Sequence, residues 1–149
     1  TFGKAFGSGG AFLATDKITG ENLIQNCGAF RYTTALAPSL CASALAALNL
    51  IESNPSWGSE LQEKSIALRD RLSQIGWQRP VGEGPIISII LGSDELAMDY
   101  QKRLEAKGIL TVAIRPPTVP EGKSRLRLVI RRNTPVQAFE RLIEVLKNK

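Results

Sequence analysis

The 149-residue sequence contains no histidine and only two cysteines. Without histidine the chain cannot supply a Ser-His-Asp triad or a Cys-His nucleophile pair, and it cannot supply the histidine-containing ligand sets of zinc. Cys27 and Cys41 lie in apolar or small-residue settings and do not have a CxxC spacing. We therefore expect neither a metal site nor catalysis by these nucleophile systems.

Long apolar runs are also missing. No segment approaches the roughly 20 residues that a membrane-spanning helix needs. The first residues do not follow the basic-then-apolar order of a signal peptide. These two absences predict a protein without membrane association and with a cytoplasmic location.

The chain is basic, with a formal net charge of +5, but its lysines and arginines are spread along the sequence and alternate with acids. This distribution favours a solvated surface over a nucleic-acid interface. A basic interaction module stays an alternative, but Arg125, Arg127 and Arg131 have no aromatic partners of the kind that stack on bases. A few placed arginines would serve small carboxylates or phosphates instead.

The first seven residues, Thr1-Phe2-Gly3-Lys4-Ala5-Phe6-Gly7, present a single amine among small residues. Gly3, Gly7, Gly9 and Gly10 free the backbone and let a bulky planar ligand approach, as a lysine that forms a Schiff base requires. The alternative is a solvated lysine in a frayed N-terminal loop.

The segment that follows is predicted to hold a short strand at 9–15 and a brief helix starting within 21–25. A helix over 39–52, with Pro38 in its first turn, is rich in small apolar residues. The adjacent hydroxyls of Thr33 and Thr34 before this helix are of the type that phosphate sites use. Asn54-Pro55 and Gly58 mark a boundary, which predicts domains at 1–55 and 56–149.

The second domain is predicted to run helix, strand, helix, strand, strand, helix. Apolar periodicity places helices at 59–75 and 94–107, with the charged residues of the first, Arg69 among them, around its polar side. The apolar run 86–91 indicates a central strand buried on both faces. Residues 125–131 alternate arginine with leucine or isoleucine, and Thr134-Pro135 reads as a cap before the last helix. This order predicts an α/β or α+β layer.

Gly122-Lys123-Ser124 ends like a phosphate-binding P-loop. The glycine that this motif requires five residues earlier is Pro117. We therefore exclude a P-loop.

With these residues in view, the chain resembles the α-oxoamine synthases, which are pyridoxal-phosphate enzymes of the aspartate-aminotransferase fold. The resemblance runs along the whole chain and is strongest to the 8-amino-7-oxononanoate synthase branch of biotin biosynthesis. It is carried by three stretches: Thr1 to Gly7 with Gly9-Gly10, Tyr32 to Pro38, and Ala113 to Pro120 followed by Gly122 and Arg125-Leu126-Arg127-Leu128.

The resemblance implies a role for each matching residue. Lys4 would hold pyridoxal 5'-phosphate as a Schiff base and remove the substrate Cα proton, and Thr1 and Thr34 would bind the cofactor phosphate, Thr34 across a homodimer interface. Arg127 would bind the amino acid carboxylate, for which its bidentate fork is suited. Arg115 and Thr118 would line the acyl side.

The resemblance also implies a parent enzyme that condenses L-alanine with a pimeloyl thioester, of coenzyme A or a carrier protein, and releases CO2. A sister synthase using glycine or serine is the alternative within the family. The family's ring-stacking residue and its pyridinium aspartate precede the lysine, so neither is in this sequence. We expect a remnant of the large cofactor domain at 1–55, a complete small domain at 56–149, and an isolated chain without activity.

Overall fold

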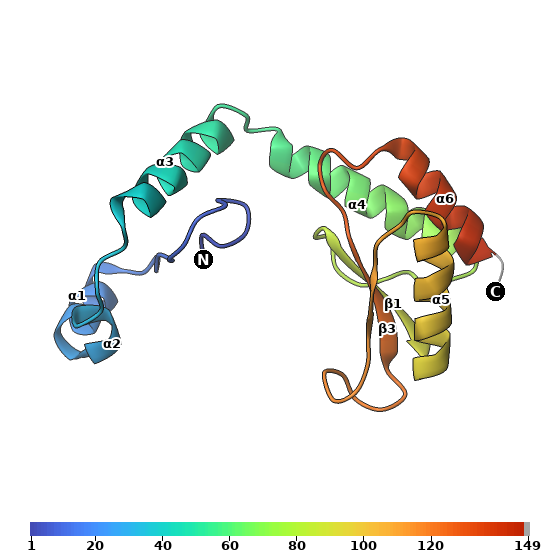
Figure 1. Ribbon diagram of the computed structural model, residues 1–149. Coiled ribbons are helices and arrows are strands. Elements are labelled where there is room, and N and C mark those ends of the chain that lie inside the picture. The colour runs from blue at the N-terminus through green and yellow to red at the C-terminus, as the bar shows by residue number, and fades with distance from the viewer. Residues whose placement is uncertain (148–149) are drawn as a thin grey trace. The chain divides into compact units, whose positions relative to one another are not determined.

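The computed structural model describes residues 1–147, which form two compact units with a boundary between Pro55 and Ser56 (Figure 1). Unit 1 is Thr1–Pro55 and unit 2 is Ser56–Lys149. None of the helices in the described part of the chain is both long enough and apolar enough to cross a membrane.

Unit 1 contains α1 (Lys17–Asn26), α2 (Gly28–Arg31) and α3 (Pro38–Glu52). The predicted strand at 9–15 is wrong: these residues are irregular, because unit 1 contains no strand with which they could pair. The helix predicted within 21–25 begins earlier. Asp16 caps it by accepting the Thr19 backbone N–H at 2.9 Å, and this bond holds the pKa of the Asp16 carboxyl below its usual value.

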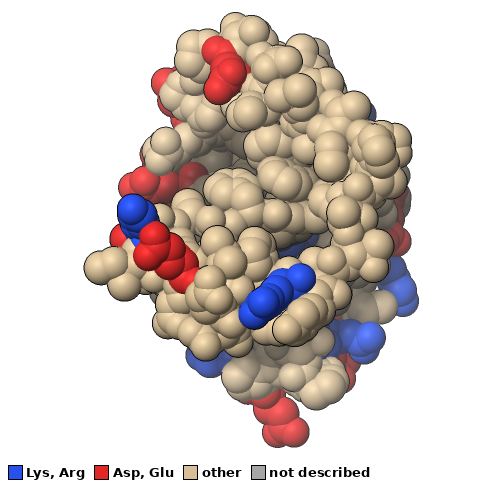
Figure 2. Space-filling model, turned by 90° about the vertical axis from the view of Figure 1, so that its left-hand side faces the viewer, with Lys and Arg blue, Asp and Glu red and all other residues tan. Residues whose placement is uncertain are grey.

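The surface of unit 1 is unusually apolar. In its three described helices no residue is buried. Phe12 is 66% exposed, Phe30 63% and Leu45 59%. Figure 2 shows a face of the molecule on which wide areas of uncharged residues, drawn in tan, lie between scattered charged side chains. Unit 1 therefore exposes the kind of apolar surface that normally packs against more protein.

Unit 2 follows the predicted order of elements. It consists of α4 (Trp57–Gln74), β1 (Ile86–Gly92), α5 (Asp94–Ala106), β2 (Val112–Ile114), β3 (Ser124–Val129) and α6 (Val136–Lys147). The three strands form an antiparallel sheet in the order β1-β3-β2. The last strand in the sequence, β3, thus lies in the middle, and β1 and β2 are both edge strands.

One face of this sheet carries the core. Leu126 and Leu128 of β3 pack with Ile87 and Ile89 of β1, and α4, α5 and α6 contribute the rest of the same cluster. The alternation predicted for β3 is confirmed. The prediction that β1 is central and buried on both faces is wrong, because Ile86 and Ile90 face outward and are about half exposed.

Two helix ends follow their sequence signals and one does not. Ser93 caps α5 by accepting the Leu96 N–H at 3.2 Å, and Gly108 takes the positive φ of 72° expected after that helix. Thr134 was predicted to cap α6. Its hydroxyl instead accepts the Arg131 N–H at 3.0 Å, which closes the turn before the helix.

Arg69 is the main correction to the predicted pattern of α4. It was assigned to the polar side of the helix, but it is only 1% exposed. Its guanidinium donates to the carbonyl oxygens of Gly84 and Ile86 at 2.9 and 3.0 Å, and also to Ser65. Burial lowers the pKa of the guanidinium. Arg69 therefore ties α4 to the loop that leads into β1 by satisfying backbone acceptors there.

We expect Arg69→Met to lower the free energy of unfolding of unit 2 by about 1–3 kcal/mol, because it strands buried carbonyl groups. Urea unfolding followed by tryptophan fluorescence measures this, since Trp57 and Trp77 both lie in unit 2. Arg71→Met on the same helix is the matched control. It removes a partly exposed, two-bond ion pair with Glu140 and should lower stability by less than Arg69→Met, by about 0–1 kcal/mol. Equal stability of the two variants would contradict the anchoring role.

Candidate functional site

Lys4 lies in a loop that closes on itself. The Phe2 N–H donates to the Gly10 carbonyl oxygen at 2.8 Å, and the Ser8 N–H donates to the Phe2 carbonyl oxygen at 3.0 Å. A tight turn from Lys4 to Gly7 is closed by the Gly7 N–H, which donates to the Lys4 carbonyl oxygen at 3.0 Å. The lysine thus belongs to a hydrogen-bonded turn and not to an unpaired terminus.

The loop is seated on the start of α3. The Ser8 side chain is nearly buried, and its hydroxyl donates to the Leu40 carbonyl oxygen at 2.7 Å. A Cβ added at Gly9 would lie 3.2 Å from Leu40 Cδ1, and one added at Gly10 would overlap the Leu36 side chain. Gly10 also has a φ of 93°. The positive φ therefore requires glycine at Gly10, where the loop approaches the segment that leads into α3.

Aromatic rings brace the base of the same loop. The Phe2 ring lies edge-on to Phe6 with 5.0 Å between centroids, and it stacks on Phe12 at 5.7 Å. Lys4 itself is exposed. The combination presents one primary amine on a braced turn whose neighbours are glycine and alanine.

The two predicted phosphate-binding threonines lie near this loop in unit 1. The Thr1 hydroxyl accepts the Gly3 N–H at 3.3 Å and lies 3.4 Å from the Gly10 carbonyl oxygen. Thr34 is exposed in the segment between α2 and α3, two residues before Leu36, which packs against Gly10. Thr1 and Lys4 therefore share the loop, and Thr34 lies in the segment that leads to the loop's contact with Leu36.

The predicted substrate-binding residues all lie in unit 2. Arg127 is exposed on the open face of the sheet, where its cross-strand neighbours are Ser88 on β1 and Val112 on β2. Directly opposed side chains in such pairs lie about 4.5–5.5 Å apart at Cβ. Because both neighbours are short, the Arg127 guanidinium stays accessible from the open face.

Arg115 and Thr118 form the ends of one turn. The Thr118 N–H donates to the Arg115 carbonyl oxygen at 3.0 Å. Arg115 directly follows Ile114, which pairs with Arg125 in the sheet. The peptide bond between Pro116 and Pro117 is cis. The sheet register thus brings this turn next to Arg125, which lies two residues before Arg127 on β3.

These arginines are free of acidic partners. Within residues 1–147 no carboxylate forms an ion pair with Arg115, Arg125 or Arg127. Among the described residues, the one hydrogen bond that their side chains make runs from Arg125 Nε to the Lys123 carbonyl oxygen, at 3.0 Å. An anion that reaches the open face would therefore meet uncompensated positive charge.

Ser88 was not identified from the sequence. Only the sheet register places it opposite Arg127. The available signal was weak: one serine interrupts the apolar run of 86–91, and serine is depleted in such strands.

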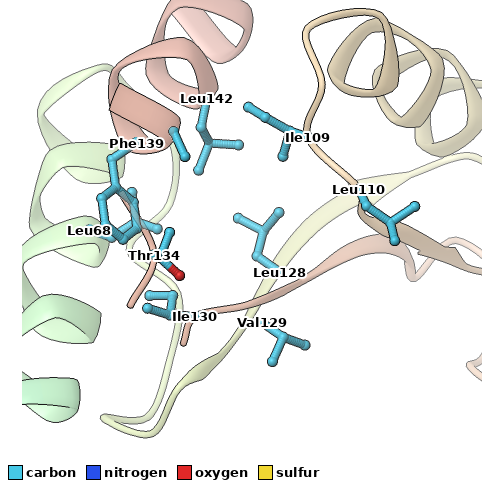
Figure 3. Close-up of a pocket in the computed structure, with 10 residues that line it drawn as sticks. Leu68, Ile109, Leu110, Leu128, Val129, Ile130, Thr134, Phe139 and Leu142 are labelled. Carbon is cyan, nitrogen blue, oxygen red and sulfur yellow. The ribbon is translucent and has the colours of Figure 1, made fainter. Parts of the chain in front are cut away.

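A small apolar cavity of about 70 Å³ lies elsewhere in unit 2 (Figure 3). Leu68, Phe139 and Leu142 from the helices and Leu128 from β3 line it. Its one side-chain hydroxyl, that of Thr134, is already bonded to Arg131. This cavity belongs to the core. Among the described residues no group of three or more histidine, cysteine, aspartate or glutamate side chains could hold a metal ion.

Comparison with known proteins places this arrangement in a family. A sequence model of the aminotransferase class I and II family matches residues 1–146, which is nearly the whole chain. The chain belongs to the aminotransferase class I and II family. Its small α/β structure is accordingly part of the aminotransferase-like fold.

Within this family the chain is similar to enzymes named 8-amino-7-oxononanoate synthase. It is 35% identical to the one of Lysinibacillus sphaericus over 99% of this chain and 38% of that protein. It is 37% identical to the one of Chromohalobacter salexigens over 98% of this chain and 38% of that protein. The chain therefore spans less than half the length of these aminotransferase-family relatives.

Solved structures agree. The crystal structure of 8-amino-7-oxononanoate synthase from Francisella tularensis superposes with a TM-score of 0.83 at 27% identity, over 98% of this chain and 43% of that one. Serine palmitoyltransferase from Sphingomonas wittichii has a TM-score of 0.84 at 23% identity, over 99% and 37%. The second likeness shows the shared aminotransferase-like fold.

We expect Gly10→Ala to loosen the Lys4 loop, because the added methyl group overlaps Leu36 and the backbone φ is strained. Trypsin should then cleave after Lys4 severalfold faster, as measured by mass spectrometry of the released peptide. Gly28→Ala adds a methyl group in the same unit at an ordinary contact distance, 3.7 Å from the Tyr32 ring. It should leave the rate unchanged, and equal rates for both variants would exclude the proposed fit.

Proposed function

We propose that this chain is part of a pyridoxal-phosphate-dependent acyltransferase of biotin biosynthesis. The parent enzyme condenses L-alanine with a pimeloyl thioester, with loss of CO2, to form 8-amino-7-oxononanoate. The observation that carries the proposal is the exposed Lys4 on a braced glycine turn, in a chain that aligns over nearly its full length with enzymes of that name.

The residues of unit 1 fit the cofactor. Lys4 provides an unhindered amine for an aldehyde, and a Cβ at the neighbouring Gly7 would meet nothing within 4 Å, which leaves space for a planar ring. The Thr1 hydroxyl supplies a neutral donor for the phosphate group, and the Thr34 hydroxyl would supply another to the cofactor of the second subunit of the parent. When bound, pyridoxal phosphate supplies an electron-withdrawing ring that accepts the electrons of a substrate carbanion.

The side chains then divide the work. Arg127 binds the carboxylate of L-alanine through two parallel N–H groups and so fixes the orientation of its Cα. The Lys4 amine accepts the proton from Cα and later returns one. Arg115 and Thr118, on the turn after β2, bind on the acyl side.

The architecture supports a larger parent. Unit 2 has its own core, and we assign it as the complete small domain. Unit 1 leaves its apolar residues exposed, and we assign it as a piece of the cofactor domain whose surface is covered by the rest of a longer chain. In that parent Thr34 would act across a homodimer interface. The 149 residues alone would then be inactive.

The parent enzyme is expected to convert L-alanine and pimeloyl-CoA to 8-amino-7-oxononanoate, detected by mass spectrometry, and Lys4→Ala should abolish the product. The 149-residue chain, assayed in parallel, should give none. Product formed only from glycine or serine with another acyl-CoA would overturn the substrate assignment and indicate a sister synthase.

Arg127→Lys in the parent enzyme should reduce kcat/KM for L-alanine about 10- to 100-fold. Lysine cannot form the bidentate pair, and a hydrogen bond to a charged group is worth about 1.5–3 kcal/mol. Steady-state kinetics should show the loss mainly in KM for the amino acid. Arg131→Lys, four residues further along the chain and exposed, is the control and should behave like the unmodified enzyme. A similar loss in both variants would refute a specific role.

A further inference from the structure

Next to Arg127, unit 2 has a hollow of about 170 Å³. None of the roles proposed above involves this hollow. Its floor includes Ser88 and Ile90 of β1 and Arg125 of β3, and its wall is the segment from Trp77 to Val81 after α4. Its volume is more than twice that of the core cavity. All of its lining residues lie within unit 2.

Two arginines line the hollow, but only one carries uncompensated charge. Arg79 Nε donates to Asp70 Oδ1 at 2.8 Å, which neutralises it. Arg125 pairs with no carboxylate among the described residues, and only its Nε is engaged, with the Lys123 carbonyl oxygen. Its two terminal Nη groups stay available, and they can bind a carboxylate end-on.

The rest of the lining is suited to an aliphatic chain. Trp77, Val81 and Ile90 offer apolar surface, and the Ser88 hydroxyl offers one neutral donor and acceptor. Trp77 is held in place, since its Nε1 donates to the Leu146 carbonyl oxygen at 3.0 Å and its ring lies edge-on to Tyr100. A fixed apolar wall with a few convergent polar groups is the usual composition of a small-molecule site.

We propose that this hollow binds an aliphatic carboxylate, with the carboxylate on the Nη groups of Arg125 and the chain along Trp77, Val81 and Ile90. Because Arg125 is the one unpaired cation among the described residues of the lining, the site should favour a ligand with one anionic end. Arg127 itself does not line the hollow, although its cross-strand neighbour Ser88 does. The proposal does not rest on the proposed function, because it concerns a site inside unit 2 and can be tested on the 149-residue chain itself.

The test is a titration of the 149-residue chain with heptanoate, followed by 1H–15N NMR. We expect saturable shifts of the amides of Val81, Ser88 and Arg125. Heptanamide has the same chain without the charge and should bind at least about tenfold more weakly.

Arg125→Gln should weaken heptanoate binding about tenfold or more, whereas Arg131→Gln, outside the hollow, should not change it. If Arg125→Gln does not fold, the comparison of heptanoate with heptanamide on the unmodified chain decides. The proposal is overturned if heptanoate gives no saturable shifts, if heptanamide binds equally well, or if the shifts map to the exposed apolar helices of unit 1.

Discussion

The pairing of β3 with a strand on each side is the constraint on which unit 2 depends. Its leucines enter the core from one face, and its arginines stand on the other. A register shift of one residue would bury Arg125 and Arg127 and expose Leu126 and Leu128, so such a shift is incompatible with this core. The same requirement that builds the core therefore positions the arginines of the candidate site.

The two units differ in how much apolar surface they bury within themselves. Unit 2 encloses a continuous core between three helices and its sheet, and a buried guanidinium, that of Arg69, joins α4 to the entry of β1. Unit 1 has a well-defined Lys4 loop, but its helices bury no residue in the described structure. That contrast agrees with a chain that spans less than half the length of its relatives.

Helices and the alternating strand were predictable because their signals are local. Apolar periodicity located α4, α5 and α6, and the alternation of 125–130 assigned the two faces of β3 correctly. β1 was wrongly predicted as a central strand, because a run of isoleucines can occur both in a central strand and in an edge strand with one open face. The strand expected at 9–15 failed for a related reason, since a strand exists only where another strand supplies hydrogen bonds.

The sequence by itself determined the candidate chemistry. Lys4 with its glycines, the threonines at 1 and 34, and the arginines after Pro120 each lie in a short stretch that can be recognised from neighbouring residues. The tertiary structure alone decided that Arg69 is buried, that Ser88 faces Arg127, and that Arg125 borders a hollow with Trp77. These relations join residues distant in sequence, and packing and strand register set them. Local propensity carries no information about either.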